Sequence, residues 1–440
     1  MPTSESSVSC TLVCDKGAVA AKLKHEPELF ERVGPGDPDG KAAYKKLIGS
    51  LVKRAELKSR VAAVLSESRG SYGKPAGPMA GILAKAAEVI MRSFISGAPI
   101  IVRFHGDGDG VAGAVALYRA MGKMVERGLS PERQVSWQTN RDVVYSKEAF
   151  YSDRLLFSSY RSVERPLLVI IDFGTHTDSN DSIKMAEQLC EVVWIDHHTL
   201  PEGFDPGKRS IYINPFDYGS DSRLSAGLVA SLISQSIGAE CRDLMEAALI
   251  SDHSACADYS NAPARKSALV LDYMITRRES DSSSLRKIDT VVRDRAKLEE
   301  LYSKVGGMMD DAISAGTAAM KRYRTLDGTN IYTIDFKKVR SGDYPAPGRF
   351  SSEMQYHLEV TTGKPAITAV YYGNYVSIRV SKGISERVDL IGIIGRLGKE
   401  SSGAVTGGGH REAASIRIGS YDTLEVLSML LDSLGAIGVT

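Results

Sequence analysis

Short apolar runs alternate with stretches of helical spacing between residues 79 and 250. A continuously apolar run, typical of a buried parallel strand, begins after Pro99 with Ile100, Ile101 and Val102. The residues that follow Gly110, VAGAVALYRAMGKMV, have the periodicity of a helix. Three further apolar runs predict strands, at Leu167–Ile171, 192–195 and Ile211–Ile213.

Helical patterns separate and follow these runs. They predict helices over residues 79–96, 183–189, 226–237 and 242–250. Ser222 and Ser225 are both candidates to cap the helix over 226–237. Strands that alternate with helices form βαβ units, so the predicted fold class is α/β with a mostly parallel sheet.

The two ends of the chain have a different pattern. Residues 1–75 contain a basic helical run over 42–66 and continue into a Gly- and Pro-rich stretch at 70–78 that predicts a linker. After residue 258 the chain is first helical and polar and then predicts strands over 330–336, 366–372 and 375–380, the last two as a hairpin, with a loop at 345–349. We therefore expect an accessory segment at 1–75, a catalytic domain at 76–325 and a smaller α+β domain at 326–440.

Acidic and histidine residues follow the first strand at alternate positions. His105, Asp107 and Asp109 lie where open α/β sheets bind their ligands, and alternate residues of an extended segment share a face. Two carboxylates and an imidazole at such close quarters suit a divalent metal ion. The alternative is a turn with solvated carboxylates.

Acidic and histidine residues also follow later predicted elements of this domain. Asp172 follows the second strand, Asp196, His197 and His198 follow the third, and Asp252 follows a helix. One such ending is common, because Asp often terminates strands and caps helices. Several endings in one sheet direct their side chains at one crevice, which favours a metal site.

Charge and cysteine content narrow the classes of function. The chain has 55 Lys and Arg against 54 Asp and Glu, so any affinity for phosphate has to be local. The five cysteines in 440 residues argue against a disulfide framework and for a reducing compartment. We see no signal peptide and no uncharged run long enough to span a membrane, and therefore expect a cytoplasmic protein with no membrane partner.

A glycine run stands near the end of the chain. Gly407, Gly408 and Gly409 precede His410 and what looks like the start of a helix. Glycines at such a place let backbone N–H groups approach an anion closely. Alone, this pattern is weak support for a ligand site.

Together these residues resemble a known family. The pattern His105-x-Asp107-x-Asp109-Gly, the later strand-end Asp172, Asp196-His197-His198 and Asp252, and GGGHREAA resemble the DHH phosphoesterases with their DHH-associated C-terminal domain. The resemblance covers about residues 79–418. With only about 25 residues after the glycine motif, the chain resembles the archaeal RecJ-like proteins or the nanoRNases. His105 stands two residues before Asp107, a spacing that resembles the RecJ-like branch.

The resemblance implies a site with two divalent metal ions in a cleft between the two domains. It assigns His105 and Asp107 to one metal, Asp109, His197 and Asp252 to the other, and Asp172 to both. It places Asp196 behind the histidines as an orienting group and His198 against the scissile phosphate. It assigns the substrate's phosphate or terminal nucleotide to Arg379, Gly408, Gly409 and His410. Carboxylate and imidazole ligands without thiolates suit Mn²⁺, with Mg²⁺ as the alternative.

The function this implies is hydrolysis of single-stranded DNA or RNA from an end, by a two-metal phosphodiesterase. The alternatives are a phosphodiesterase for short oligonucleotides or for cyclic or linear dinucleotides, and a non-catalytic scaffold in a replication complex. Replication or repair proteins are the expected protein partners, and DNA repair the expected process.

Overall fold

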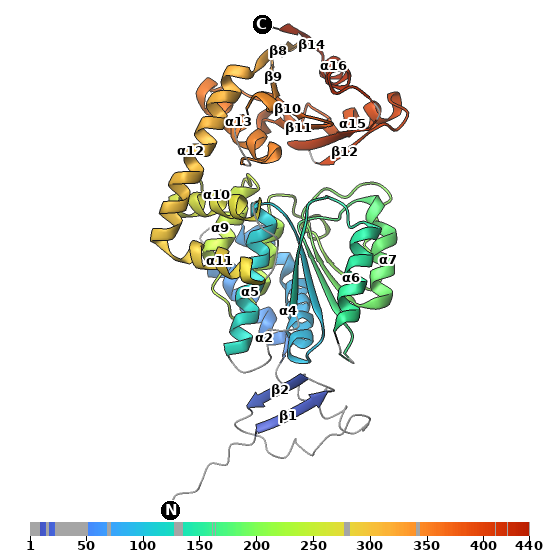
Figure 1. The fold of residues 1–440 in the computed structure, drawn as a ribbon, viewed down its shortest axis with the longest axis vertical. Helices are drawn as coiled ribbons and strands as arrows, with labels where there is room; N and C mark the ends of the chain where they lie inside the picture. The colour runs from blue at the N-terminus through green and yellow to red at the C-terminus, as the bar shows by residue number, and fades with distance from the viewer. Residues whose placement is uncertain are drawn as a thin grey trace, which may run out of the picture. The chain divides into compact units, whose positions relative to one another are not determined.

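The structure is a computed structural model that describes residues 9–14, 17–22, 52–67, 72–126, 135–160, 162, 164–276, 282–339, 344–409, 411–419 and 421–439. The chain divides into two compact units, Met1–Glu299 and Glu300–Thr440 (Figure 1). Across the described part of the chain, no helix has the length and apolar character needed to cross a bilayer.

The first unit is built on a five-stranded sheet of order β4-β3-β5-β6-β7, in which every neighbouring pair is parallel. β3 and β5 are buried along almost their whole length, which explains why their sequences are continuous apolar runs. The chain leaves β3 for β4 on one side and returns to β5 on the other. The carboxyl ends of β3 and β5 therefore flank a topological switch point, where open α/β sheets bind ligands. The bounds are β3 (Ile100–His105), β4 (Val135–Asn140), β5 (Leu167–Ile171), β6 (Glu191–Ile195) and β7 (Ile211–Ile213).

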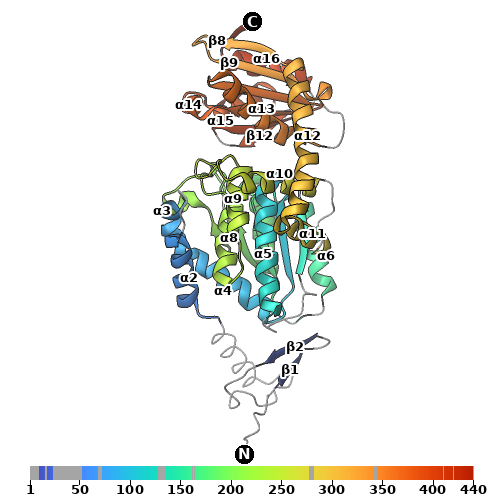
Figure 2. The same ribbon diagram turned by 90° about the vertical axis from the view of Figure 1, so that its left-hand side faces the viewer.

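Helices cover both faces of this sheet (Figures 1 and 2). One face carries α4 (Ala80–Ile95), α5 (Gly108–Glu126) and α8 (Ala226–Ile237), and the other carries α6 (Lys147–Ser159) and α7 (Asn180–Leu189). Further helices pack on this first layer: α2 (Arg54–Glu67) on α4 and α8, and α9 (Arg242–Ser251), α10 (Ala262–Thr276) and α11 (Ser282–Arg293) on α5. The predicted α/β class with a parallel sheet is confirmed. Of the two predicted caps, Ser225 caps α8, because its Oγ accepts the Leu228 N–H.

The predicted linker at 70–78 is wrong for the part that the structure describes. Gly73–Ala76 forms the short helix α3, and the 3-10 turn η2 at Gly77–Met79 continues into α4. Ala76 and Met79 are fully buried and anchor the segment to the first unit, and Pro78 is tolerated because it stands in a first turn. Nearer the start of the chain, β1 (Ser9–Cys14) and β2 (Gly17–Lys22) form an antiparallel hairpin.

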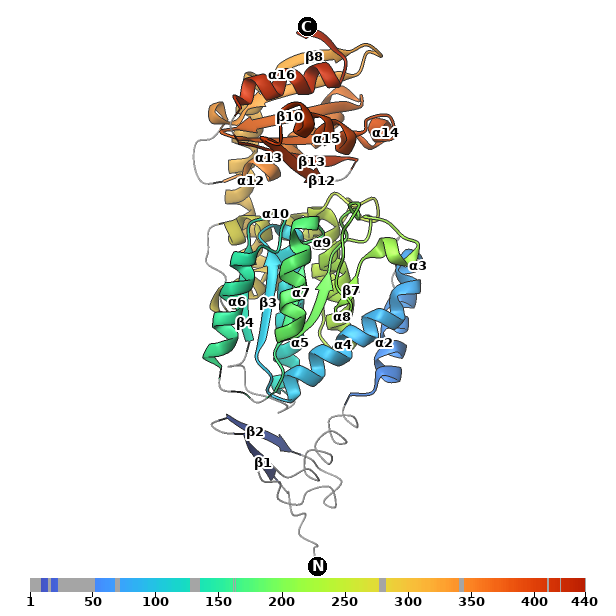
Figure 3. The same cartoon turned by 90° about the vertical axis from the view of Figure 1, so that its right-hand side faces the viewer.

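The second unit is built on a seven-stranded mixed sheet of order β12-β13-β11-β10-β9-β8-β14 (Figure 3). Its β9–β10 pair is parallel and the other neighbouring pairs are antiparallel. The bounds are β8 (Lys321–Thr325), β9 (Asn330–Asp335), β10 (Ala366–Tyr372), β11 (Tyr375–Val380), β12 (Val405–Gly409), β13 (Ala413–Ile418) and β14 (Ala436–Val439). The predicted hairpin of residues 366–372 and 375–380 is confirmed.

Alternate residues of these strands enter two cores. Tyr332 and Ile334 of β9 pack with α13 (Pro347–Thr362) and α12 (Arg295–Ala319). Ile331 of β9 packs with α15 (Leu390–Glu400) and α16 (Thr423–Ser433). The short helix α14 (Lys382–Ser385) follows β11. Helices on both faces of a mixed sheet agree with the α+β character predicted for the end of the chain.

Two local predictions for this unit are corrected. The predicted loop at 345–349 ends early, because α13 already begins at Pro347, whose fixed φ suits a first helical position. The residues after the glycine run form a strand and not a helix: β12 pairs with β13 as a hairpin. The reason is visible in β13, where Ala414, Ile416 and Ile418 are buried at alternate positions, a period of two that belongs to a strand.

Candidate metal centre

His105, Asp107 and Asp109 stand on the sharp connection from β3 to α5. His105 ends β3, and its Nδ1 lies 2.9 Å from Asp107 Oδ2. Asp107 Oδ1 accepts the Gly110 N–H at 3.0 Å and so closes the first turn of α5. The connection requires glycine: a Cβ on Gly110 would lie 2.4 Å from the carbonyl oxygen of His105.

Asp172 follows β5 and lies against two histidines. Its backbone N–H donates to Ile195 O at 2.8 Å and so extends the pairing of β5 with β6. Its φ of 67°, in the left-handed region, then turns the chain. For a residue other than glycine this conformation costs on the order of 1 kcal/mol or more, and such strain often marks functional sites. Asp172 is 2% exposed, with Oδ2 at 3.7 Å from His105 Nδ1 and Oδ1 at 3.4 Å from His197 Nε2.

The residues after β6 are held by their neighbours. His197 Nδ1 lies 3.1 Å from the carbonyl oxygen of Ser222, which can only accept a hydrogen bond. We therefore place a ring hydrogen on Nδ1, so that Nε2, which faces Asp172, is the nitrogen that could bind a cation. His198 Nδ1 lies 2.6 Å from Oδ1 of the fully buried Asp196. Asp196 thus contacts His198 at its ring Nδ1 and His197 at its backbone N–H.

Asp252 and Asp109 complete the surroundings of His197. Asp252 ends α9, with Oδ2 at 3.6 Å from His197 Nδ1. Asp109 is 3% exposed, and both its carboxylate oxygens lie 3.2 Å from the Gly227 N–H at the start of α8. A Cβ at Gly227 would lie 2.4 Å from the Asp109 carbonyl oxygen, so this approach of α8 also needs glycine.

Two groups of ligand atoms share Asp172. His105, Asp107 and Asp172 each offer an atom within 4.8 Å of the others, and so do Asp172, His197 and His198. Five of the predicted residues are therefore brought together: His105, Asp107, Asp172, His197 and His198. Asp109 and Asp252 belong to neither close group; Asp252 contacts His197 of the second group, and Asp109 contacts the Gly227 N–H.

Burial and mutual repulsion disfavour the charged form of two of these carboxyls. Burial, with the carboxylate of Asp172 adding to it, raises the pKa of Asp109 well above its usual range. The same two causes raise the pKa of Asp252 to about 6. Without a cation between them, these groups hold protons at a pH where free carboxylates have lost theirs.

For the histidines, by contrast, the surroundings favour the charged form. Burial alone would lower the pKa of His105, but Asp107 and Asp172 outweigh burial and raise it well above the usual histidine value. For His197, Asp252 and Asp172 outweigh burial in the same way. The protons bound to this cluster therefore supply positive charge that a divalent cation could supply instead.

The donor set fits a divalent cation of the Mn²⁺ or Mg²⁺ class. It combines carboxylate oxygens with imidazole nitrogens and contains no thiolate. The His197 ring is oriented by a carbonyl oxygen on its other nitrogen, as is usual for a metal-binding histidine. Shared use of Asp172 by two ligand groups is the geometry that a bridging carboxylate requires.

Binding of Mn²⁺ is expected to release protons and to weaken as the pH falls. Groups with a raised pKa hold protons below that pKa, and a cation has to displace them. Affinity should therefore fall as the pH is lowered, first as His105 and His197 take up protons and further as the pH passes through about 6, the pKa of Asp252. Calorimetric titration with Mn²⁺ in buffers of different ionisation enthalpy counts the released protons. Asp252→Asn should make the dependence shallower, and an affinity that does not change with pH would contradict the expectation.

Three of the substrate residues predicted for the second unit lie on two strands of its sheet that are separated by one strand. Arg379 is on β11, where its guanidinium donates to Ser352 Oγ at 2.9 Å and to Ser377 Oγ at 3.2 Å. Gly408 and Gly409 are on β12, and Gly409 has a φ of 144°. β13 lies between these two strands. His410 lies outside the described residues.

Some contacts of the site have no signal in the sequence. The Ser222 carbonyl that orients His197 is a backbone group and can belong to any residue. Thr175 donates to Asp196, and only its place three residues after Asp172 marks it. Such partners depend on how the loops after different strands meet, which spacing along the chain does not reveal.

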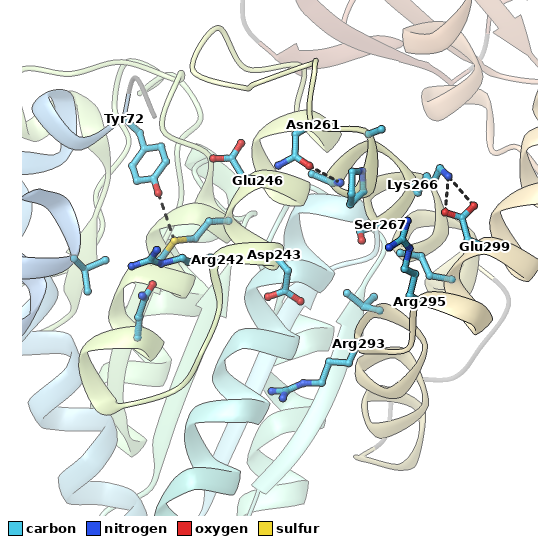
Figure 4. A pocket seen from close by; sticks show the side chains of 18 of the residues that line it. Tyr72, Arg242, Asp243, Glu246, Asn261, Lys266, Ser267, Arg293, Arg295 and Glu299 are labelled. Atoms are coloured by element: carbon cyan, nitrogen blue, oxygen red, sulfur yellow. Dashed lines mark hydrogen bonds and ion pairs between the residues drawn. The ribbon is translucent and has the colours of Figure 1, made fainter. Parts of the chain in front are cut away.

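A cavity of about 660 Å³ lies elsewhere in the first unit (Figure 4). Its lining residues come from α2, α8, α9, α10, α11 and the start of α12, with Tyr72, and include none of the cluster. Charged side chains pair across its wall, as Lys266 does with Glu299. The metal cluster is therefore a separate feature of this unit.

Comparison with known proteins finds a family match over the part of the chain that holds most of the cluster. Residues 99–251 match the DHH family, N-terminal domain, a range that contains the whole cluster except Asp252. An uncharacterized protein of Methanocaldococcus jannaschii is 24% identical, with 76% of this chain aligned to 51% of that protein, so the chain spans about half the length of this relative.

Two solved structures extend the comparison. The DHH domain of a member of a family of ribosomal proteins is similar with a TM-score of 0.73 at 24% identity, covering 90% of this chain and 98% of that one. The exonuclease RecJ bound to manganese is similar with a TM-score of 0.46 at 14% identity, covering 80% and 93%. The first of these likenesses shows a shared fold.

Proposed function

We propose, from the match of residues 99–251 to the DHH family, N-terminal domain, that this chain is a metal-dependent phosphodiesterase. The proposed reaction removes nucleotides from an end of single-stranded DNA or RNA, as in RecJ-like exonucleases. The observation that carries the proposal is the contact of one buried carboxylate, Asp172, with His105 on one side and His197 on the other. Two ligand groups that share a carboxylate suit a pair of cations, with Mn²⁺ preferred and Mg²⁺ as the alternative.

Each side chain has a role in this proposal. His105 and Asp107 would hold one cation, Asp109, His197 and Asp252 would hold the other, and Asp172 would contribute to both. Two such cations would activate water and stabilise charge on the attacking and leaving oxygens at phosphorus. Asp196 fixes the His198 ring through its Nδ1, so that the other ring nitrogen is available to the scissile phosphate.

Substrate binding and partners follow from the same proposal. Arg379, Gly408, Gly409 and His410 would hold the phosphate or the terminal nucleotide of the strand. Replication or repair proteins are the proposed protein partners, and DNA repair the proposed process. A cytoplasmic location is supported by Cys190 and Cys241, which are buried free thiols.

The test is a nuclease assay on the purified full-length chain. Single-stranded DNA and RNA labelled at the 5′ or the 3′ end, and dinucleotides, are incubated with Mn²⁺, with Mg²⁺ or with a chelator. With Mn²⁺ we expect nucleotides to be released from one end of the long strands. With the chelator we expect no release. Hydrolysis of dinucleotides alone would overturn the exonuclease proposal in favour of an oligonucleotide phosphodiesterase, and hydrolysis of no substrate would favour the scaffold alternative.

A further inference from the structure

A partly buried ring of hydrogen bonds surrounds Asp196 and His198. Asp196 Oδ2 accepts the Thr175 hydroxyl at 2.6 Å and the Thr175 N–H at 3.0 Å. The Thr175 oxygen lies 2.9 Å from the Tyr212 hydroxyl, which in turn lies 2.9 Å from Asn214 Nδ2. The same Asn214 nitrogen donates to the carbonyl oxygen of His198 at 2.9 Å and so closes the ring.

The direction of each hydrogen bond in the ring is determined. Thr175 gives its one hydroxyl hydrogen to Asp196, so it has to accept from Tyr212. Tyr212 then has to accept from the Asn214 amide, whose two hydrogens serve Tyr212 and the His198 carbonyl. Asn214 Oδ1 accepts the Phe216 N–H at 3.1 Å, which fixes the orientation of the amide.

Packing holds these groups in place. Asn214 and Asp196 are 0% exposed. The Tyr212 ring packs edge-on against Trp194, with ring centroids 5.2 Å apart, and against Phe204 at 5.5 Å. The hydroxyl of Tyr212 is thus fixed by contacts that do not involve it, so removing the oxygen alone leaves the aromatic packing intact.

We infer that Thr175, Tyr212 and Asn214 are positioning residues that act through Asp196 to keep the ring hydrogen of His198 on Nδ1. Asp196 Oδ1 already accepts the His197 N–H at 2.8 Å and the His198 Nδ1–H at 2.6 Å. Among the described residues, only Thr175 donates a hydrogen bond to its Oδ2, and Thr175 is oriented by Tyr212. The hydroxyls therefore set the position of the carboxylate that orients the His198 ring. What His198 does with its other ring nitrogen rests on the proposed function.

The test observes the His198 ring directly in the full-length protein. Proton–nitrogen NMR of ¹⁵N-histidine-labelled, metal-free protein records the Nδ1–H resonance, assigned by its loss in His198→Gln. We expect a slowly exchanging Nδ1 proton in the wild type, and exchange with water faster by about tenfold in Thr175→Val and in Tyr212→Phe. Thr175→Ser keeps the hydroxyl and should exchange like the wild type.

Tyr118→Phe is the matched control. Tyr118 also packs edge-on against a tryptophan, Trp137, with centroids 6.0 Å apart, but lies outside the ring. Its exchange should equal that of the wild type. The inference is overturned if the wild type shows no slowly exchanging His198 Nδ1 proton, if Thr175→Val and Tyr212→Phe exchange like the wild type, or if Thr175→Ser exchanges as fast as Thr175→Val.

An activity measurement separates this inference from the proposed function. In the nuclease assay, Thr175→Val and Tyr212→Phe should lower kcat by about tenfold and change KM by less than about twofold, because the ring orients His198 and does not contact substrate. Thr175→Ser should restore kcat. A wild-type chain without nuclease activity would refute the proposed function, while the NMR exchange rates would still decide the inference.

Discussion

Replacing Asp172 with asparagine is expected to lower the rate of metal-dependent phosphodiester hydrolysis by about a thousandfold or more. Asparagine keeps the size of the side chain but removes the charge and one of the two oxygens. Those oxygens face His197 Nε2 at 3.4 Å and His105 Nδ1 at 3.7 Å, so one substitution affects both ligand groups. The measurement is kcat with Mn²⁺ on the single-stranded substrate that the wild type degrades.

Asp181→Asn is the control for this substitution. Asp181 lies on α7 with its side chain 70% exposed, and it pairs with Lys147 at the surface. Its removal should leave kcat within about twofold of the wild type. An Asp172→Asn protein that retains more than about a tenth of the wild-type kcat would show that Asp172 does not bridge the site.

Replacing Asp153 with alanine is expected to lower the free energy of unfolding of the first unit by about 3–5 kcal/mol. Asp153 on α6 is 1% exposed and accepts from Arg103 Nε of β3 at 3.1 Å and from the Tyr145 hydroxyl at 3.0 Å. Its loss leaves the buried guanidinium of Arg103 without its partner. Both tryptophans of the chain, Trp137 and Trp194, lie in this unit, so their fluorescence during urea unfolding reports its stability.

The double variant Arg103→Met with Asp153→Leu distinguishes loss of the ion pair from loss of packing. Apolar side chains of similar size should recover most of the lost stability, because an unpaired buried charge destabilises more than an absent pair does. A double variant as unstable as Asp153→Ala would show that the effect of the single substitution comes from packing.

The apolar runs are the strands that the sequence predicts best. Leu167–Ile171, which is buried throughout, and Ile211–Ile213, an edge strand with two buried isoleucines, have the predicted bounds. β4, at the other edge of the sheet, was missed because its sequence VSWQTN is polar and only partly buried. β12 was missed because three of its residues are glycines, which carry no side-chain pattern. A run of buried apolar residues, more than strand propensity, makes a strand predictable from this sequence.

For the site, the sequence predicted which residues meet and left open how they are arranged. The strand-end positions predicted that Asp172 would join His105 and His197, and the structure brings them together. That His198 belongs to the second close group depends on the rotation of its ring, which Asp196 determines. Hydrogen bonds between loops after different strands decide such rotations, and no spacing along the chain records them.

The number of Mn²⁺ ions bound by each chain tests the central claim most directly. Equilibrium titration of the metal-free protein, with free Mn²⁺ followed by electron paramagnetic resonance, gives this number at neutral pH. The arrangement of Asp172 between two ligand groups predicts two ions in the wild type and a loss of binding in Asp172→Asn. A wild-type chain that binds no Mn²⁺, or an Asp172→Asn chain that binds it as the wild type does, would contradict the metal centre and the hydrolase proposed from it.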